Sequence, residues 1–247
     1  MDVSVLRSKE VIIFDLDGTL IDSTNMYNEI YSDLVKMVTG KVVTADQIQI
    51  DWDEFVQTDA GESNLSDGFL LFLNNKYNDK EARLEELRSL HKRIESDYLS
   101  GKIEYKEYAS EVVKLLKEKG YKLVLATTSP RSILDVYNNN NANLTSKMRI
   151  DDYFDLVLTH DDVKKRKPDP EVYLIALEKM NVAREKCLII EDSIEGVMAA
   201  NNAGIEVLNI VDENMHNSQK QIDKLSTYKM NSLKEFYELL KTTEYSE

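Results

Sequence analysis

The stretch FDLDGTL, Phe14 to Leu20, follows the apolar residues VII and places two aspartates where a buried strand is expected to end. The apolar run VIIFD is typical of a parallel strand that is buried on both faces. Ligands of open parallel sheets bind beyond the carboxyl ends of the strands, which is where Asp15 is expected to lie. Asp15 and Asp17 would share a face of a regular strand, about 6.6 Å apart. They could therefore serve one ligand.

Gly18 and the residues after it leave two interpretations open. A glycine permits a sharp turn or a close approach by a ligand, and the backbone N–H groups of the following turn can bind an anion. Alternatively, Asp-Gly is an ordinary turn in which Asp17 caps the next element. Taken alone, this short stretch favours neither interpretation, because short motifs also match by chance.

The rest of the chain alternates predicted strands with predicted helices. Further strands are expected at 121–127 (YKLVLAT), 154–159 (FDLVLT), 187–192 (CLIIED) and 206–211 (EVLNIV). Apolar stripes at helical spacing predict helices over 24–38, over 87–98 before Gly101, and over 105–116 before Gly120. Further helices are expected near Asp169, with Pro170 at the first position, and from Ser193 to Gly204. This alternation predicts an α/β fold, a Rossmann-like doubly wound parallel sheet with helices on both faces.

One segment breaks the alternation and indicates a second domain. From Ser23 to about Leu99 the sequence has helical stripes and no convincing strand. We therefore predict a core formed by residues 1–21 and 103–247, with an all-helical domain, 22–102, inserted after the first strand. The asparagine-rich patch Asn138 to Asn143 is predicted to be an exposed loop.

Composition excludes several classes of partner. In the chain of 247 residues, 45 acidic and 31 basic residues give a net charge of −14, so nucleic acid is not an expected partner. No stretch is long and apolar enough for a membrane span or a signal peptide. The single cysteine, Cys187, cannot form an internal disulfide and is expected to be a small buried residue. We expect a cytoplasmic protein with no membrane partner, and a monomer by default.

Polar residues suited to one reaction follow three other predicted strands. LVLATTS ends in Thr127, Thr128 and Ser129, which offer hydroxyls and loop amides. KKRKPDPEVY places Lys167 just before a helix, with Asp169 as the expected N-cap. Taken alone, the hydroxyls are a weak signal, and a lysine in a basic run is usually solvated surface.

The last of these strands, CLIIEDS, ends in Glu191 and Asp192. Alone, they could be an N-cap pair that a helix dipole stabilises. Together with Asp15, Asp17 and Lys167 they describe a site with acids from two strands and one cation. Clustered carboxylates raise one another's pKa unless a divalent cation and a lysine compensate, and an oxygen-rich set suits Mg²⁺.

These stretches resemble the haloacid dehalogenase superfamily, close to the beta-phosphoglucomutase-like phosphatases that carry a helical cap after the first strand. The matching stretches are FDLDGTLIDS, LVLATTS, KPDPEVY and CLIIEDSIEGVMAANNAGI, in the family's order. The last is long and highly specific, and the core matches over most of its length. The cap matches in position and helical character only.

The resemblance implies a division of labour between the first two aspartates. Asp15 would be the nucleophile that attacks a phosphoryl group and forms an aspartyl-phosphate. Asp17 would protonate the leaving oxygen and later activate water, with its side chain turned away from the metal. The backbone carbonyl of Asp17 would be a metal ligand.

The resemblance also implies a set of binding residues and a substrate class. Asp192 would bind Mg²⁺ directly beside Asp15 and Asp17, with Glu191 either a ligand or a partner acting through water. Thr127 and Lys167 would bind the transferring phosphoryl oxygens. The implied substrate-binding set is Gly18, Thr19, Thr127, Thr128, Ser129 and Lys167. The implied substrate is a small phosphorylated metabolite of the sugar phosphate, phosphoglycolate or nucleotide type.

Departures from the family pattern bear on the reaction. The sugar-phosphate mutases carry a histidine where Tyr27 stands, so mutase activity loses support, although this tyrosine could simply belong to an apolar stripe. Haloacid dehalogenases lack the second aspartate, so Asp17 argues against dehalogenation. Phosphonatases need a cap lysine, and neither Lys36 nor Lys41 stands in a recognisable context. Arg166 replaces a glycine that often precedes the equivalent of Lys167.

Two other classes of protein are alternatives to a phosphatase, a receiver domain and a catalytically silent relative. Receiver domains of two-component signalling also combine acids, a hydroxyl and a lysine, but their phospho-acceptor follows a later strand than their acidic pair, and no helical domain follows their first strand. A catalytically silent relative that binds a phosphorylated ligand is the third class. The order of the motifs and the length of the chain argue against a receiver domain, and the intact set Asp15, Asp17, Lys167 and Asp192 argues against a silent relative.

Overall fold

The structure is a computed structural model that describes residues 1–57, 65–78, 82–211 and 219–242. It divides into two compact units. The first unit comprises Met1–Ser23 and Ile103–Glu247, and the second comprises Thr24–Lys102. The predicted helical segment 22–102 includes residues 58–64 and 79–81, which lie outside the described residues.

A six-stranded parallel sheet forms the centre of the first unit, which confirms the predicted fold class. Its strand order is β3-β2-β1-β4-β5-β6. The strands are β1 (Val11–Phe14), β2 (Lys122–Ala126), β3 (Leu156–Leu158), β4 (Cys187–Glu191), β5 (Val207–Ile210) and β6 (Tyr228–Met230). Strand β6 was not predicted from the sequence, because it is a three-residue edge strand with one buried residue and is too short for a periodic signal.

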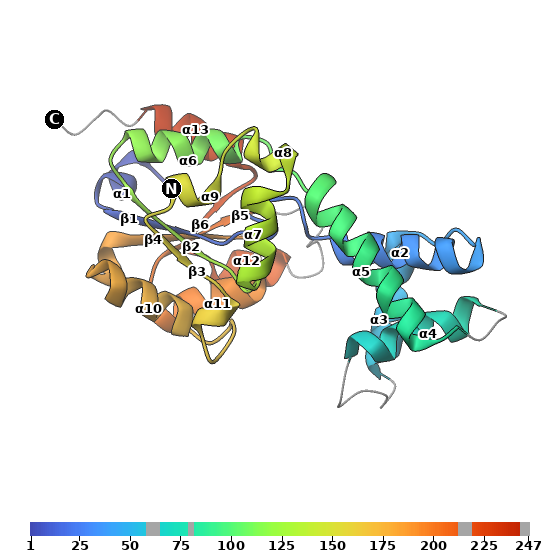
Figure 1. Ribbon diagram of the computed structural model, residues 1–247. Helices are drawn as coiled ribbons and strands as arrows, with labels where there is room; N and C mark the ends of the chain where they lie inside the picture. The colour runs from blue at the N-terminus through green and yellow to red at the C-terminus, as the bar shows by residue number, and fades with distance from the viewer. Residues whose placement is uncertain (58–64, 79–81, 212–218, 243–247) are drawn as a thin grey trace. The chain divides into compact units, whose positions relative to one another are not determined.

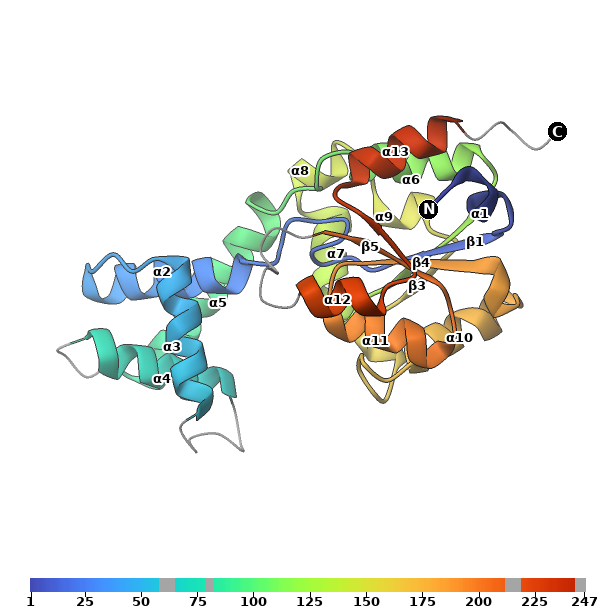
Figure 2. The ribbon, with the colours of Figure 1, turned by 180° about the vertical axis from the view of Figure 1, so that it is seen from behind.

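Helices cover both faces of this sheet, as the alternation predicted (Figures 1 and 2). On one face lie α6 (Ala109–Glu118) and α13 (Leu233–Thr242), and on the other α10 (Glu171–Met180), α11 (Ile194–Ala203) and α12 (Gln219–Leu225). All four residues of β1 are buried, as expected for a strand between two helical layers. Cys187 is buried at the start of β4, where it acts as a small core residue.

Shorter elements complete the first unit, and helices make up the described part of the second. The remaining helices of the first unit are α1 (Val3–Arg7), α7 (Arg131–Asn139), α8 (Ala142–Thr145), α9 (Ile150–Tyr153) and the 3₁₀ turns η1 (His160–Asp162) and η2 (Arg184–Lys186). The second unit contains α2 (Met26–Thr39), α3 (Ala45–Gln57), α4 (Leu65–Tyr77) and α5 (Leu84–Gly101). Among the described residues, no helix has the length and apolar character needed to cross a bilayer.

The position of β1 between β2 and β4 places the end of the first strand at the centre of the sheet. Phe14 pairs with Leu125 on one side and with Ile190 on the other. The chain leaves strand geometry after Phe14, and the Asp15 N–H donates to the Ile190 carbonyl at 3.0 Å. The strand order reverses at β1, and such a switch point opens a crevice at the carboxyl ends of the strands. Asp15 lies there.

Two helix starts differ from the prediction. The helix expected over 105–116 begins at Ala109, because Tyr105 pairs with Ile21 in an isolated bridge and Tyr108 has a left-handed φ of 65°. Neither conformation continues a helix. The prediction that Asp169 is an N-cap was also wrong. Pro170 occupies that position, and the Asp169 carboxylate instead accepts from the Glu171 N–H at 3.1 Å.

Tyr27 does not belong to the apolar stripe of its helix. Its side chain is 45% exposed, whereas the buried residues of α2 are Met26, Ile30, Tyr31, Leu34 and Val35. The predicted stripe was therefore shifted by one residue at its start, because a tyrosine is compatible with either environment.

The asparagine-rich patch is not an exposed loop. Asn138 is the last buried residue of α7, and Asn141 is fully buried as the N-cap of α8. The Asn138 side chain accepts from the Ile150 N–H at 2.9 Å. The Asn141 side chain accepts from the Leu144 N–H at 2.9 Å and donates to the Ile103 carbonyl at 3.0 Å. Buried backbone groups need such partners, and asparagine supplies both a donor and an acceptor.

We predict that Asn141→Ala lowers the free energy of unfolding by about 2 kcal/mol, because two buried backbone groups lose their partners. Urea denaturation measures this change. Asn140→Ala is the matched control, since Asn140 is exposed and precedes the capping position. Equal stability of the two variants would contradict the role assigned to Asn141.

Candidate active site

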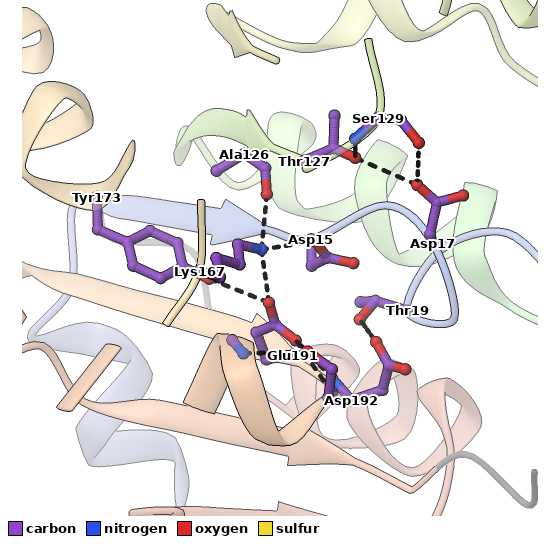
Figure 3. Close-up of polar contacts among 12 residues, drawn as sticks. Asp15, Asp17, Thr19, Ala126, Thr127, Ser129, Lys167, Tyr173, Glu191 and Asp192 are labelled. Atoms are coloured by element: carbon purple, nitrogen blue, oxygen red, sulfur yellow. Dashed lines mark hydrogen bonds and ion pairs between the residues drawn. The ribbon is translucent and has the colours of Figure 1, made fainter. Parts of the chain in front are cut away.

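The buried ammonium group of Lys167 joins two strands of the sheet (Figure 3). Its Nζ lies 2.6 Å from Asp15 Oδ1 and 2.6 Å from Glu191 Oε1, and it also donates to the Ala126 carbonyl at 3.0 Å. The Lys167 side chain is only 4% exposed, and those of Asp15 and Glu191 are 8% and 0% exposed. One cation therefore bridges carboxylates that follow β1 and end β4.

Donors of the chain surround the Glu191 carboxylate. Oε1 accepts from the Tyr173 hydroxyl at 3.1 Å in addition to Lys167. Oε2 accepts from the backbone N–H groups of Asp192 and Ser193 at 3.0 and 3.1 Å, and from the Ser193 hydroxyl at 3.0 Å. A methyl group at Gly196 would come within 1.8 Å of Oε1, so the carboxylate lies where only glycine leaves room. Hydrogen bonds to both oxygens and the close packing of Gly196 therefore fix the position of the Glu191 carboxylate.

A third acid completes a cluster that could hold a cation. Asp15, Glu191 and Asp192 each offer an oxygen atom within 4.8 Å of the others, and all three residues are buried. Asp192 Oδ1 accepts from the Thr19 hydroxyl at 2.6 Å. Hard oxygen donors at this spacing suit a magnesium ion. Lys167 contacts Asp15 Oδ1. Among the described hydrogen bonds, none ends on the other carboxylate oxygen, Oδ2.

The Asp17 carboxylate lies apart from this cluster and accepts from hydroxyl groups. Its Oδ2 accepts from Ser129 at 2.7 Å and from Thr127 at 3.2 Å, and its Oδ1 accepts from Ser23 at 2.8 Å. The Ser129 N–H also donates to the Thr127 hydroxyl at 3.0 Å, which orders the loop after β2. Asp15 and Asp17 thus have different partners, a cation for one and neutral hydroxyls for the other.

Burial governs the electrostatics of this site. Burial raises the pKa of the Asp15 carboxyl well above its usual range, the Lys167 ammonium opposes that rise, and the charges of Glu191 and Asp192 add to it. Burial also disfavours the charged form of Lys167, but the two adjacent carboxylates raise its pKa well above its usual range, so it stays protonated. Burial raises the pKa of Tyr173 well above its usual range, which keeps its hydroxyl a donor.

Most of the predicted site residues converge at this edge of the sheet. Direct contacts connect Asp15, Lys167 and Glu191 in one group, and Asp17, Thr127 and Ser129 in another. Gly18 has a φ of 81°, so the turn after Asp17 needs a residue without a side chain. Thr19 is fully buried against Asp192, and Thr128 is exposed and takes part in neither group.

Several site residues were missed by the sequence analysis. Tyr173 donates to Glu191 Oε1 from α10, and Gly196 of α11 lies against the same carboxylate. Ser193 caps α11, and its hydroxyl donates to Glu191 Oε2. Asn209, buried in β5, donates to the Glu191 carbonyl at 3.1 Å. Asn209 carried a signal, because a polar residue inside an apolar strand needs a specific partner. Tyr173 and Gly196 lie within the family-matching stretches KPDPEVY and CLIIEDSIEGVMAANNAGI, but those stretches assigned them no role at the site.

Comparisons with known proteins agree with this fold. A family model described as haloacid dehalogenase-like hydrolase matches residues 9–204. The chain is 30% identical over 201 residues to the phosphorylated carbohydrates phosphatase of Thermotoga maritima, covering 80% of this chain and 82% of that protein. It is 31% identical over 193 residues to the pyrophosphatase PpaX of Bacillus cereus, covering 78% and 79%. A crystal structure from Thermotoga maritima, provisionally named a beta-phosphoglucomutase, superimposes with a TM-score of 0.75 at 28% identity, covering 95% of this chain and 100% of that one.

The chain therefore belongs to the haloacid dehalogenase-like hydrolase family, as its motifs predicted. It is an enzyme of the hydrolase class. The beta-phosphoglucomutase-like branch is the part of the family that it resembles.

We predict that Lys167→Met lowers the free energy of unfolding by about 3 kcal/mol in the presence of a chelator, because Asp15 and Glu191 then lose their shared cation. Urea denaturation measures the loss. The double variant Lys167→Met with Glu191→Gln should recover part of it, since one buried charge is removed with its shape kept. A single variant as stable as the unaltered chain would show that the bridge is not needed.

Proposed function

We propose that this chain is a Mg²⁺-dependent phosphatase that hydrolyses a small phosphorylated metabolite through an aspartyl-phosphate. The observation that supports this best is the Lys167 ammonium, 2.6 Å from Asp15, beside an acidic cluster at the switch point of the sheet. A nucleophilic carboxylate and a fixed cation together suit the transfer of an anionic phosphoryl group. The names of the relatives agree with phosphate chemistry.

The donor set fits a magnesium ion. Asp15 and Asp192 would hold it with their carboxylates, and Asp17 with its backbone carbonyl. Glu191 fits a supporting role better than direct coordination, because Lys167, Tyr173 and Ser193 already donate to its two oxygens. When bound, the ion would neutralise charge on the phosphoryl oxygens and lower the pKa of Asp15.

In the first step the Asp15 carboxylate attacks the phosphorus, so that an oxygen–phosphorus bond forms while the bond to the leaving oxygen breaks. Lys167 orients Asp15 and offers positive charge to the transferring oxygens. Thr127, whose hydroxyl donates to Asp17 Oδ2 at 3.2 Å, would contribute a further donor. Positioning and charge stabilisation supply most of the catalysis in phosphoryl transfer.

Asp17 would carry the proton in both steps. It donates a proton to the leaving oxygen, then removes one from the water that attacks the phosphorus and releases phosphate. Its hydroxyl partners, Ser23, Thr127 and Ser129, are neutral and can rotate, so they can accompany either protonation state. Burial raises the pKa of Asp15, and a bound magnesium ion beside the Lys167 ammonium would lower it again, so that Asp15 would suit the ionised role.

A phosphosugar mutase of the beta-phosphoglucomutase type is the second candidate, supported by the structural similarity to a protein provisionally given that name. The residue at the position of the mutase histidine is Tyr27, so the imidazole of the mutases is replaced by a phenol. Hydrolysis is therefore the better supported reaction. We propose that the helical unit, Thr24–Lys102, is the cap that selects the substrate.

We predict that p-nitrophenyl phosphate is hydrolysed only with Mg²⁺, and that Asp15→Asn lowers kcat at least about 10³-fold because the amide cannot act as the nucleophile. A colorimetric assay before and after treatment with a chelator measures both effects. Activity should return when Mg²⁺ is added back. Undiminished turnover by Asp15→Asn would refute the proposed chemistry.

We predict that Gly196→Ala lowers kcat about 100-fold, because the new methyl group displaces the Glu191 carboxylate and with it Lys167. The same assay measures the loss, and circular dichroism checks that the variant folds. Gly101→Ala is the matched control, since a methyl group there meets no atom within 4 Å. If both variants keep full activity, the placement of Glu191 does not matter for the reaction.

A further inference from the structure

Asn209 places a buried amide in the apolar strand β5, beside the end of β4. The residue is 0% exposed, and it is level with Glu191 in the register of the two strands. The other residues of β5, Val207, Leu208 and Ile210, are buried and apolar. Burial of an amide is costly unless its donors and its acceptor find partners, whereas a leucine fills such a place in a core without that demand. The asparagine therefore serves something other than packing.

Three polar groups contact the Asn209 amide. Its Nδ2 donates to the Glu191 carbonyl at 3.1 Å and, at the longer distance of 3.5 Å, to the Ile210 carbonyl. Its Oδ1 accepts from Gln219 Nε2 at 3.1 Å. A carbonyl oxygen can only accept, so the Asn209 nitrogen is assigned to the side of Glu191. Asn209 thus connects the backbone at the end of β4 with the first residue of α12.

The Glu191 carbonyl belongs to the peptide group that links Glu191 to Asp192, two members of the acidic cluster. The N–H at the other end of this peptide group donates to Glu191 Oε2 at 3.0 Å. A peptide group is planar, so hydrogen bonds at its two ends set its orientation. The Asp192 carboxylate itself accepts from the Thr19 hydroxyl at 2.6 Å (Figure 3). Asn209 therefore acts on the backbone from which Asp192 reaches the cluster.

Gln219 holds the Asn209 amide from the side of α12. Its Nε2 also donates to Asp223 Oδ1 at 2.6 Å, and Asp223 Oδ2 accepts from Lys229 Nζ of β6 at 2.6 Å. An ionised carboxylate has no hydrogen to donate, so the contact with Asp223 assigns the nitrogen of the Gln219 amide to this side. The Gln219 nitrogen thus connects the buried Asn209 to an exposed ion pair.

We propose that Asn209 is a positioning residue for Asp192, the proposed metal ligand, and that Gln219 supports it. The inference rests on the proposed Mg²⁺-dependent function, because it concerns the affinity of the acidic cluster for that ion. Among the described hydrogen bonds of Asn209, none ends on a carboxylate of the cluster, so its effect passes through the Glu191 backbone. Partners that orient metal ligands in this way typically change metal affinity about 10- to 100-fold.

The test measures Mg²⁺ binding by Asn209→Leu, which keeps the approximate size of the side chain and removes the donor. Calorimetry with Mg²⁺ as the only ligand compares this variant with the unaltered chain, and we expect Kd to rise about tenfold. In the p-nitrophenyl phosphate assay, the Mg²⁺ concentration that gives half the maximal rate should rise by the same factor. The KM for the substrate at saturating Mg²⁺ should stay unchanged, which a general loss of structure would not produce.

Two control variants separate positioning from stability. Thr227→Val removes another side-chain hydrogen bond to β5, which the Val207 N–H donates at 3.1 Å at the end of the strand away from the site. Asn141→Ala removes a buried helix cap elsewhere in the same unit. Both variants should keep the Mg²⁺ affinity of the unaltered chain. The inference is overturned if Asn209→Leu binds Mg²⁺ as tightly as the unaltered chain, or if the controls weaken binding as much.

A second variant tests the support from α12. Gln219→Met keeps the length of the side chain and removes the amide, and we expect Kd for Mg²⁺ to rise about threefold. In the Asn209→Leu background the same substitution should have no further effect, because the connection is already broken. Additive effects of the two substitutions would contradict the support by Gln219. If Asn209→Leu does not fold, Gln219→Met decides alone, and an unchanged affinity overturns the inference.

Metal binding also keeps this result distinct from that of the proposed function. A chain that binds Mg²⁺ without hydrolysing p-nitrophenyl phosphate would overturn the proposed phosphatase, and calorimetry would still decide on Asn209. A chain that binds no Mg²⁺ would overturn the positioning role, whatever its activity.

Discussion

One buried cation between two buried carboxylates is the constraint on which the site depends. Asp15 directly follows β1 and Glu191 ends the neighbouring strand β4, and without Lys167 their negative charges would lie close together in a poorly solvated space. Burial of an ion is costly unless its partner and its hydrogen bonds are in place. Lys167 meets this demand with three contacts, the third to the Ala126 carbonyl of β2. Three adjacent strands are thus tied together at their carboxyl ends.

Glu191 extends this constraint into the helical layer. Its carboxylate contacts Tyr173 from α10, and the Ser193 and Gly196 positions at the start of α11. Five donors contact its two oxygens and fix the orientation of the side chain. Because Lys167 contacts this fixed carboxylate, the position of its ammonium group is fixed as well. A site for phosphoryl transfer gains from such fixed charges, since they need not reorganise during the reaction.

The sequence predicted the sheet and the convergence of its loops, because apolar runs that end in polar residues mark the carboxyl edge of a parallel sheet. It failed where structure depends on distant contacts. Asn141 looked like part of a polar loop but caps a helix in the core. Tyr108 left the helix through a positive φ that no local pattern marks. Gly196 lay in a family-matching stretch without an assigned role, and only the structure shows the Glu191 carboxylate packed against it. The spacing of apolar residues in the sequence predicts which faces of helices and strands are buried. Contacts between residues that are distant in the sequence form only in the completed fold.

The end of β1 explains how two aspartates in one short stretch can act differently. Had the strand continued, Asp15 and Asp17 would face the same ion from one side. Instead the chain turns after Phe14, Leu16 is buried between them, and Gly18 closes the turn with a φ of 81°. The Asp15 carboxylate contacts the Lys167 ammonium group, whereas the Asp17 carboxylate accepts hydrogen bonds from hydroxyl groups. A nucleophile must stay ionised and an acid must hold a proton. The backbone geometry of four residues therefore gives the two aspartates different surroundings, as the proposed division of roles requires.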